Sequence, residues 1–141
     1  DLGAPQLGLD EAAVQRVRDG CDSIYHCAAQ VDFLHPYASL KGPNVDSVVT
    51  LLEWTSQGRP KTLHYVSTLA VIGQNEDGGT VTERSALPSW NGLVDGYSQS
   101  KWVADALARE AQARGMPVAI YRLGAVTGDH DHAICNAADL I

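Results

Sequence analysis

The chain has 141 residues, which is enough for one ordinary domain and too few for two. Its 17 acidic and 10 basic side chains give a formal net charge of -7, and no cluster of lysine and arginine could neutralise a nucleic-acid backbone. Its 3 cysteines lack Cys-x-x-Cys spacing, and no apolar stretch reaches the roughly 18 residues that cross a bilayer. We therefore expect a cytoplasmic protein that binds neither nucleic acid nor a membrane.

The beginning of the chain predicts a helix followed by a buried strand. Asp10 is suited to cap a helix, and apolar residues after it recur at three- and four-residue spacing as far as Gly20. The segment 23–29 is a short apolar run of the kind that lies inside a parallel sheet.

Two further pairs of helix and strand follow in the sequence. Apolar residues with a helical period between 37 and 57 predict a helix that ends before Gly58, and a strand is expected over 62–67. The polar segment 74–96 predicts a long surface loop that shapes a site. A helix over 97–114 and a strand over 118–123 complete the pattern.

The order strand, helix, strand, helix, strand predicts an α/β fold with parallel strands, right-handed crossovers and helices on both faces of the sheet. A complete dinucleotide fold has a Gly-x-Gly-x-x-Gly turn that holds a pyrophosphate, and this sequence does not supply one. We therefore predict the second half of a Rossmann-type doubly wound parallel sheet, with the glycine-rich first half missing upstream. Such a fragment is expected to be inactive by itself.

Two groups of polar side chains are candidates for catalysis. Tyr97 and Lys101 lie four residues apart on one helix face, where an ammonium can stabilise a phenolate and make the tyrosine a general acid. A pair of this kind standing alone is more often a feature of a helix surface. Ser67 and Thr68 end the second strand at the ligand-binding edge of the sheet, although such a pair is also typical of a cap or turn.

The order of these groups is more specific than any one of them. Tyr65-Val66-Ser67-Thr68, Tyr97-Ser98-Gln99-Ser100-Lys101 and Tyr121-Arg122-Leu123-Gly124 together resemble the extended short-chain dehydrogenase/reductases. The segments 40–45, 63–71 and 96–101 are similar to the thioester reductase domains of nonribosomal peptide and polyketide synthetases and of carboxylic acid reductases.

The resemblance implies a role for each matching residue. Thr68 would orient the substrate carbonyl, Tyr97 would donate a proton, Lys101 would bind the nicotinamide ribose, and Asn44 would support a proton relay. The cofactor would also contact residues spread along the chain. These are Asp1, Leu2, Ala28, Ala29, Gln30, Ser67 and Leu123.

The resemblance also implies NADPH as cofactor and reduction of an acyl or peptidyl thioester on the phosphopantetheine arm of a carrier protein. Residues 1–128 would form the C-terminal half of the NAD(P)-binding domain, and 129–141 would begin a substrate-binding region within a larger multidomain protein. A fatty acyl-CoA reductase, a sugar-nucleotide epimerase or dehydratase, and a non-catalytic dinucleotide sensor remain alternatives. The run Asp129-His130-Asp131-His132 lacks a spaced partner set, so we assign no metal.

Overall fold

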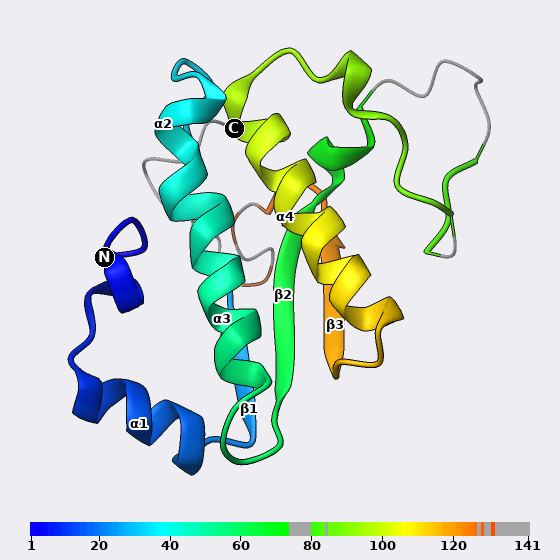
Figure 1. Cartoon of the computed structure of the whole chain (residues 1–141). Coiled ribbons are helices and arrows are strands. Elements are labelled where there is room, and N and C mark those ends of the chain that lie inside the picture. Colours follow the sequence, from blue (N-terminus) through cyan, green and yellow to red (C-terminus); the bar gives the residue numbers. More distant parts are fainter. Residues whose placement is uncertain (74–79, 84, 127, 129–130, 132–141) are drawn as a thin grey trace.

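Three parallel strands form the centre of the molecule, which is described here by a computed structural model (Figure 1). The structure describes residues 1–73, 80–83, 85–126, 128 and 131. The strands are β1 (Ser23–His26), β2 (Thr62–Thr68) and β3 (Val118–Leu123), and they pair in the order β1-β2-β3. Their parallel pairing confirms the α/β fold class expected from the sequence.

The helices lie close to their expected positions. They are α1 (Glu11–Gly20), α2 (Tyr37–Lys41), α3 (Ser47–Thr55) and α4 (Gly96–Ala113). A π-helical turn (Gly42–Asp46) joins α2 to α3, and single 3₁₀ turns occupy Pro5–Gly8, Leu69–Ile72 and Trp90–Gly92. Pro43 has no N–H to donate within the helix, and Ser47 N–H donates instead to Gly42 O, which widens this turn.

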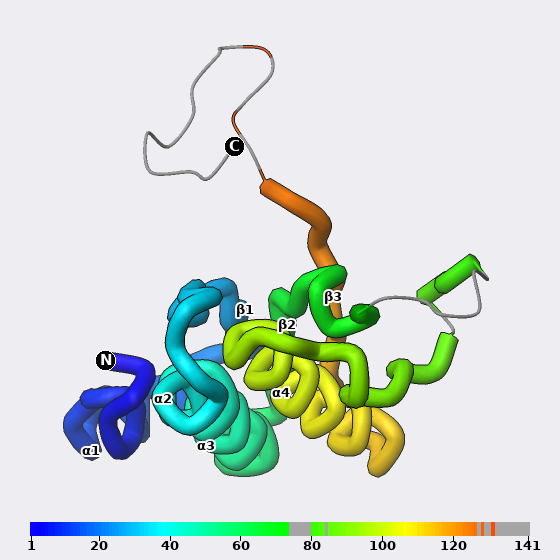
Figure 2. Tube along the Cα trace, turned by 90° about the horizontal axis from the view of Figure 1, so that it is seen from above, coloured from blue at the N-terminus to red at the C-terminus, as the bar shows by residue number. Residues whose placement is uncertain are grey.

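The helices α3 and α4 lie on the same face of the sheet, as Figure 2 shows from above. Right-handed crossovers that advance in one direction across a sheet place their helices on one side. The prediction that helices cover both faces is therefore wrong for the part of the chain that the structure describes. On the other face, Tyr25 and Tyr121 stay 68% and 42% exposed on either side of His64.

The core lies between the sheet and these helices. Leu63 and Tyr65 of β2 face the helices and are fully buried, because side chains alternate along a strand. The small Ala104 and Ala108 let α4 approach the sheet closely, and Trp54 of α3 belongs to the same core. This packing holds α4 against β2.

One strand is shorter than expected. The sequence predicts a strand over 23–29, whereas β1 ends at His26. The chain turns away there because the backbone N–H and C=O of Gln30 bond to the side chain of Asn44 instead of to a neighbouring strand. None of the helices in the described ranges is long and apolar enough to cross a membrane.

Candidate active site

The candidate site lies where the carboxyl ends of the strands meet the beginning of α4 (Figure 1). Asp95 caps this helix by accepting a hydrogen bond from Ser98 N–H at 2.7 Å. Gly96 follows it, and a Cβ atom at that position would lie 2.4 Å from His35 O and 2.5 Å from Tyr37 N. Only glycine allows the backbone of 35–37 to pass this close to the helix.

Tyr97 is half-buried at this helix start. The ring of Phe33 packs edge-on against its ring at 5.2 Å between centroids. Burial and the nearby carboxylate of Asp95 raise the pKa of Tyr97, while hydrogen bonding to Thr68 lowers it. The phenol is therefore protonated at neutral pH, as a proton donor must be.

Thr68 has two roles at the end of β2. Its Oγ1 accepts a hydrogen bond from Ala70 N at 3.2 Å and so caps the 3₁₀ turn that follows. Its hydroxyl also forms a hydrogen bond with the side chain of Tyr97. Thr68 therefore caps the turn after the strand, as expected, and also lies beside Tyr97.

Lys101 lies one turn further along α4 and is almost fully buried, at 3% exposure. Its Nζ donates to Val66 O at 3.0 Å and stands 4.5 Å above the centre of the Tyr65 ring. Burial lowers its pKa to about 8, against the opposing effect of Asp105. We expected Lys101 to lower the pKa of Tyr97; the pKa of Tyr97 is instead raised by burial and by Asp95, and the group that lowers it is Thr68.

Asn44 joins three parts of the site. Its Oδ1 accepts from Gln30 N at 2.7 Å, and its Nδ2 donates to Gln30 O at 2.9 Å and to Ser100 Oγ at 3.0 Å. Ser100 Oγ in turn donates to Tyr97 O at 2.8 Å. Asn44 therefore holds the loop after β1 against the beginning of α4.

The other expected cofactor contacts occupy different places. Leu123 pairs in register with Thr68 at the same sheet edge, and Ala28 and Ala29 follow the end of β1. Ser67 points to the helix-covered face and donates to Asp105 Oδ2 at 2.6 Å. Asp1 and Leu2 lie in a turn that packs against the π-helical turn before α3.

The structure adds residues that the sequence did not single out. Gly96 permits the close approach beside Tyr97, and Phe33 supplies the ring that packs on it. Asp105 and Arg122 form an ion pair beneath Ser67. The four-residue spacing of Asp105 from Lys101 was a signal, because it places both on one helix face.

The remaining candidates from the sequence are a metal site, the cysteines and two polar segments. The described residues contain no cluster of histidine, cysteine or acidic side chains that could hold a metal ion. Of the run 129–132, the structure describes Asp131 alone, and Cys21 and Cys27 are free thiols. The expected loop 74–96 is described from 80 to 83 and from 85 onward, and the expected substrate region 129–141 lies outside the described residues apart from Asp131.

Comparison with known proteins identifies the family. Residues 1–141 match the NAD-binding domain family described as male sterility protein. The chain belongs to this family. It is 39% identical to the isonitrile lipopeptide synthase of Streptomyces coeruleorubidus, over 100% of the chain and 10% of that protein. The family and the sheet order confirm a Rossmann-like domain.

Solved structures agree with this assignment. The terminal reductase domain of the myxalamid synthetase pathway superposes with a TM-score of 0.84 and 45% identity, over 91% of this chain and 33% of that one. The dTDP-glucose 4,6-dehydratase of Bacillus anthracis, in complex with NAD, gives a TM-score of 0.58 and 29% identity, over 73% of this chain and 30% of that one. The chain thus spans about a third of its solved relatives. The resemblance to extended short-chain reductases of the thioester reductase type is confirmed.

The family binds a nicotinamide cofactor, and the site fits the nicotinamide end of one. An ammonium has three donors, and Lys101 Nζ gives one of them to Val66 O, so it can also bond ribose hydroxyls. The carboxyl edge of a parallel sheet is where such ligands bind. Lys101 and Tyr97 are the residues that would hold the nicotinamide ribose.

Proposed function

We propose that this chain is the catalytic half of a reductase domain that uses NADPH to reduce an acyl or peptidyl thioester to an aldehyde. The observation that carries this proposal is the grouping of Thr68, Tyr97 and Lys101 at the end of β2. The relatives support it, because one solved relative is the terminal reductase domain of a polyketide–peptide pathway.

The side chains of this site would each act on the substrate carbonyl. When bound, NADPH supplies the hydride that reduces the carbonyl carbon. Thr68 donates a hydrogen bond to the carbonyl oxygen, and Tyr97 transfers its phenolic proton to that oxygen as negative charge develops. The Lys101 ammonium stabilises the resulting phenolate.

The product of this step is a thiohemiacetal. Its C–S bond breaks, the hydroxyl proton passes to the departing thiolate, and an aldehyde and a free thiol result. A second reduction to the alcohol would use the same groups. Asn44 keeps Tyr97 in place by holding Ser100, whose hydroxyl bonds Tyr97 O.

The proposal extends to the partner and the setting. The substrate would be carried on the phosphopantetheine arm of a carrier protein, within a multidomain cytoplasmic synthetase. The Asp1, Leu2, Ala28, Ala29 and Gln30 region would lie along the adenosine, and the backbone at Ser67 and Leu123 would lie near the nicotinamide. Residues 1–128 would then complete the cofactor domain, and 129–141 would begin the substrate region.

The test is a turnover assay with an intact reductase domain that contains this chain and its glycine-rich half. The same acyl group is offered on a carrier protein and on coenzyme A, each with NADPH or NADH, and a nucleotide sugar serves as a third substrate. We expect NADPH oxidation and a trapped aldehyde with the carrier-bound thioester. Turnover confined to acyl-CoA or the nucleotide sugar, or cofactor binding without any turnover, would overturn the proposal.

A further inference from the structure

A buried ion pair lies beneath the candidate site and connects three elements. Asp105 of α4 is fully buried, and Arg122 of β3 binds it with two hydrogen bonds, Nε to Oδ2 at 2.9 Å and Nη2 to Oδ1 at 2.6 Å. Ser67 of β2 donates to the same carboxylate at 2.6 Å. Three charge-assisted hydrogen bonds thus fix one carboxylate between the helix and two strands.

The position of this cluster relates it to the proposed chemistry. Ser67 lies between Val66, whose carbonyl accepts the hydrogen bond of Lys101, and Thr68, which meets Tyr97. Because Ser67 points the other way from its two neighbours, its bond to Asp105 anchors the strand without filling the substrate side. The carboxylate therefore holds in place the segment that supports both catalytic side chains.

The carboxylate of Asp105 also favours the protonated form of Lys101. Among the residues that the structure describes, the titratable side chains that face Lys101 are His26 of β1, Tyr65 of β2 and Asp105 of α4. Burial lowers the pKa of His26 to about 4 and raises the pKa of Tyr65, so both are neutral at neutral pH. The negative charge beside Lys101 then comes from Asp105.

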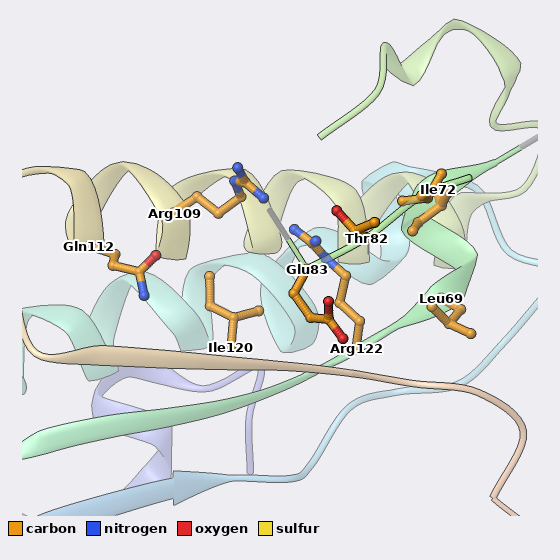
Figure 3. Close-up of a pocket in the computed structure, with 9 residues that line it drawn as sticks. Leu69, Ile72, Thr82, Glu83, Arg109, Gln112, Ile120 and Arg122 are labelled. Carbon is orange, nitrogen blue, oxygen red and sulfur yellow. The ribbon is translucent and has the colours of Figure 1, made fainter. Parts of the chain in front are cut away.

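The positive charge of Arg122 partly offsets the negative charge of Asp105. Arg122 lines a cavity of about 390 Å³ between α4 and β3 together with Arg109 and Glu83 (Figure 3). Arg109 Nη1 donates to Ser85 O at 3.2 Å, whereas Arg122 Nη2 donates to Asp105 Oδ1. The balance between Asp105 and Arg122 sets how strongly the carboxylate attracts Lys101.

We propose that Asp105 is a positioning residue that holds the end of β2 through Ser67 and keeps Lys101 charged, while Arg122 tunes its effect. The inference rests on the proposed reductase function. Once Lys101 loses its proton, the ribose contact and the support of the phenolate weaken. Activity should therefore fall as pH rises through the pKa of Lys101, about 8.

The test compares pH profiles of kcat/KM in the intact reductase domain. Asp105→Asn removes the negative charge and should move the alkaline limb down by about 1 pH unit. Arg122→Gln leaves that charge unbalanced and should move the limb to higher pH. Arg122→Lys keeps the positive charge and should restore the original profile. Shifts of the alkaline limb in opposite directions in Asp105→Asn and Arg122→Gln support the proposal. Limbs that do not move, or that move in the same direction in both variants, overturn it.

Two further arms keep the test decisive. Ser67→Ala keeps both charges and removes a small hydroxyl, so it should fold and lower kcat while leaving the alkaline limb in place; an unchanged kcat refutes the positioning role. Should Asp105→Asn fail to fold, the comparison of Arg122→Gln with Arg122→Lys decides the electrostatic role. Reduction by the unmodified domain and its loss in Tyr97→Phe establish the function separately, so the two proposals can fail independently.

Discussion

Replacing Lys101 with methionine should stabilise the fold while abolishing turnover. Burial lowers the pKa of the Lys101 ammonium from 10.5 to about 8. Each pKa unit corresponds to about 1.36 kcal/mol, so keeping this charge at neutral pH costs the folded protein about 3 kcal/mol. Methionine has a similar length and no charge, but it leaves Val66 O without its donor, at a cost of about 1 kcal/mol. The net gain should be about 2 kcal/mol.

The stability of the original protein should also depend on pH in a defined window. Between about 8 and 10.5 the unfolded lysine still binds a proton that the folded one has released. Stability therefore rises with pH across this window, by about 3 kcal/mol from Lys101. Lys101→Met lacks this contribution, so its advantage should disappear as pH rises.

Urea denaturation of both proteins at a series of pH values measures this difference. Lys61→Met is the matched control, since Lys61 is equally buried but donates to three carbonyl oxygens, of Trp54, Gln57 and Arg59. Its loss should destabilise the protein. Parallel stability curves for the original protein and Lys101→Met would refute the reasoning, because they would mean that folding leaves the proton affinity of Lys101 unchanged.

Three more substitutions test the site. Tyr97→Phe should lower kcat by about 10²- to 10⁴-fold with near-normal NADPH binding in a fluorescence titration, and retention of half the activity would exclude it as the acid. Gly96→Ala should destabilise by about 1–3 kcal/mol in thermal melts, because its Cβ would meet the backbone of 35–37, whereas Gly92→Ala, which meets nothing within 4 Å, should be neutral. Asn44→Ala should raise the KM for NADPH, since it frees the loop at Gln30; an unchanged KM would contradict this role.

Much of the fold follows from local sequence patterns. The cap at Asp10 is confirmed by its bond to Ala13 N at 2.7 Å, and β3 has the bounds that its apolar run predicts. These features depend on residues close together in the chain. The end of β1 could not be predicted in this way, because a side chain 14 residues away captures the backbone of Gln30.

The same distinction applies to the candidate site. Spacing alone places Tyr97 and Lys101 on one helix face, and a strand end alone places Thr68 at the ligand edge. The pKa values of Tyr97 and Lys101 depend on burial, which arises from packing between distant segments. For this reason the sequence predicts which groups are present but not the direction in which the pKa of Tyr97 moves.

The site combines rigid support with a charge that is costly to bury. Lys101 has one carbonyl acceptor, an aromatic face and one nearby carboxylate, whereas the structural Lys61 has three carbonyl acceptors. An ammonium kept mainly for stability would be expected to resemble Lys61. The unused donors of Lys101 leave it able to bind a ligand, and they lower the stability of the unliganded fold. Cofactor binding should therefore recover part of that cost, which links the occupancy of the site to the stability of the domain.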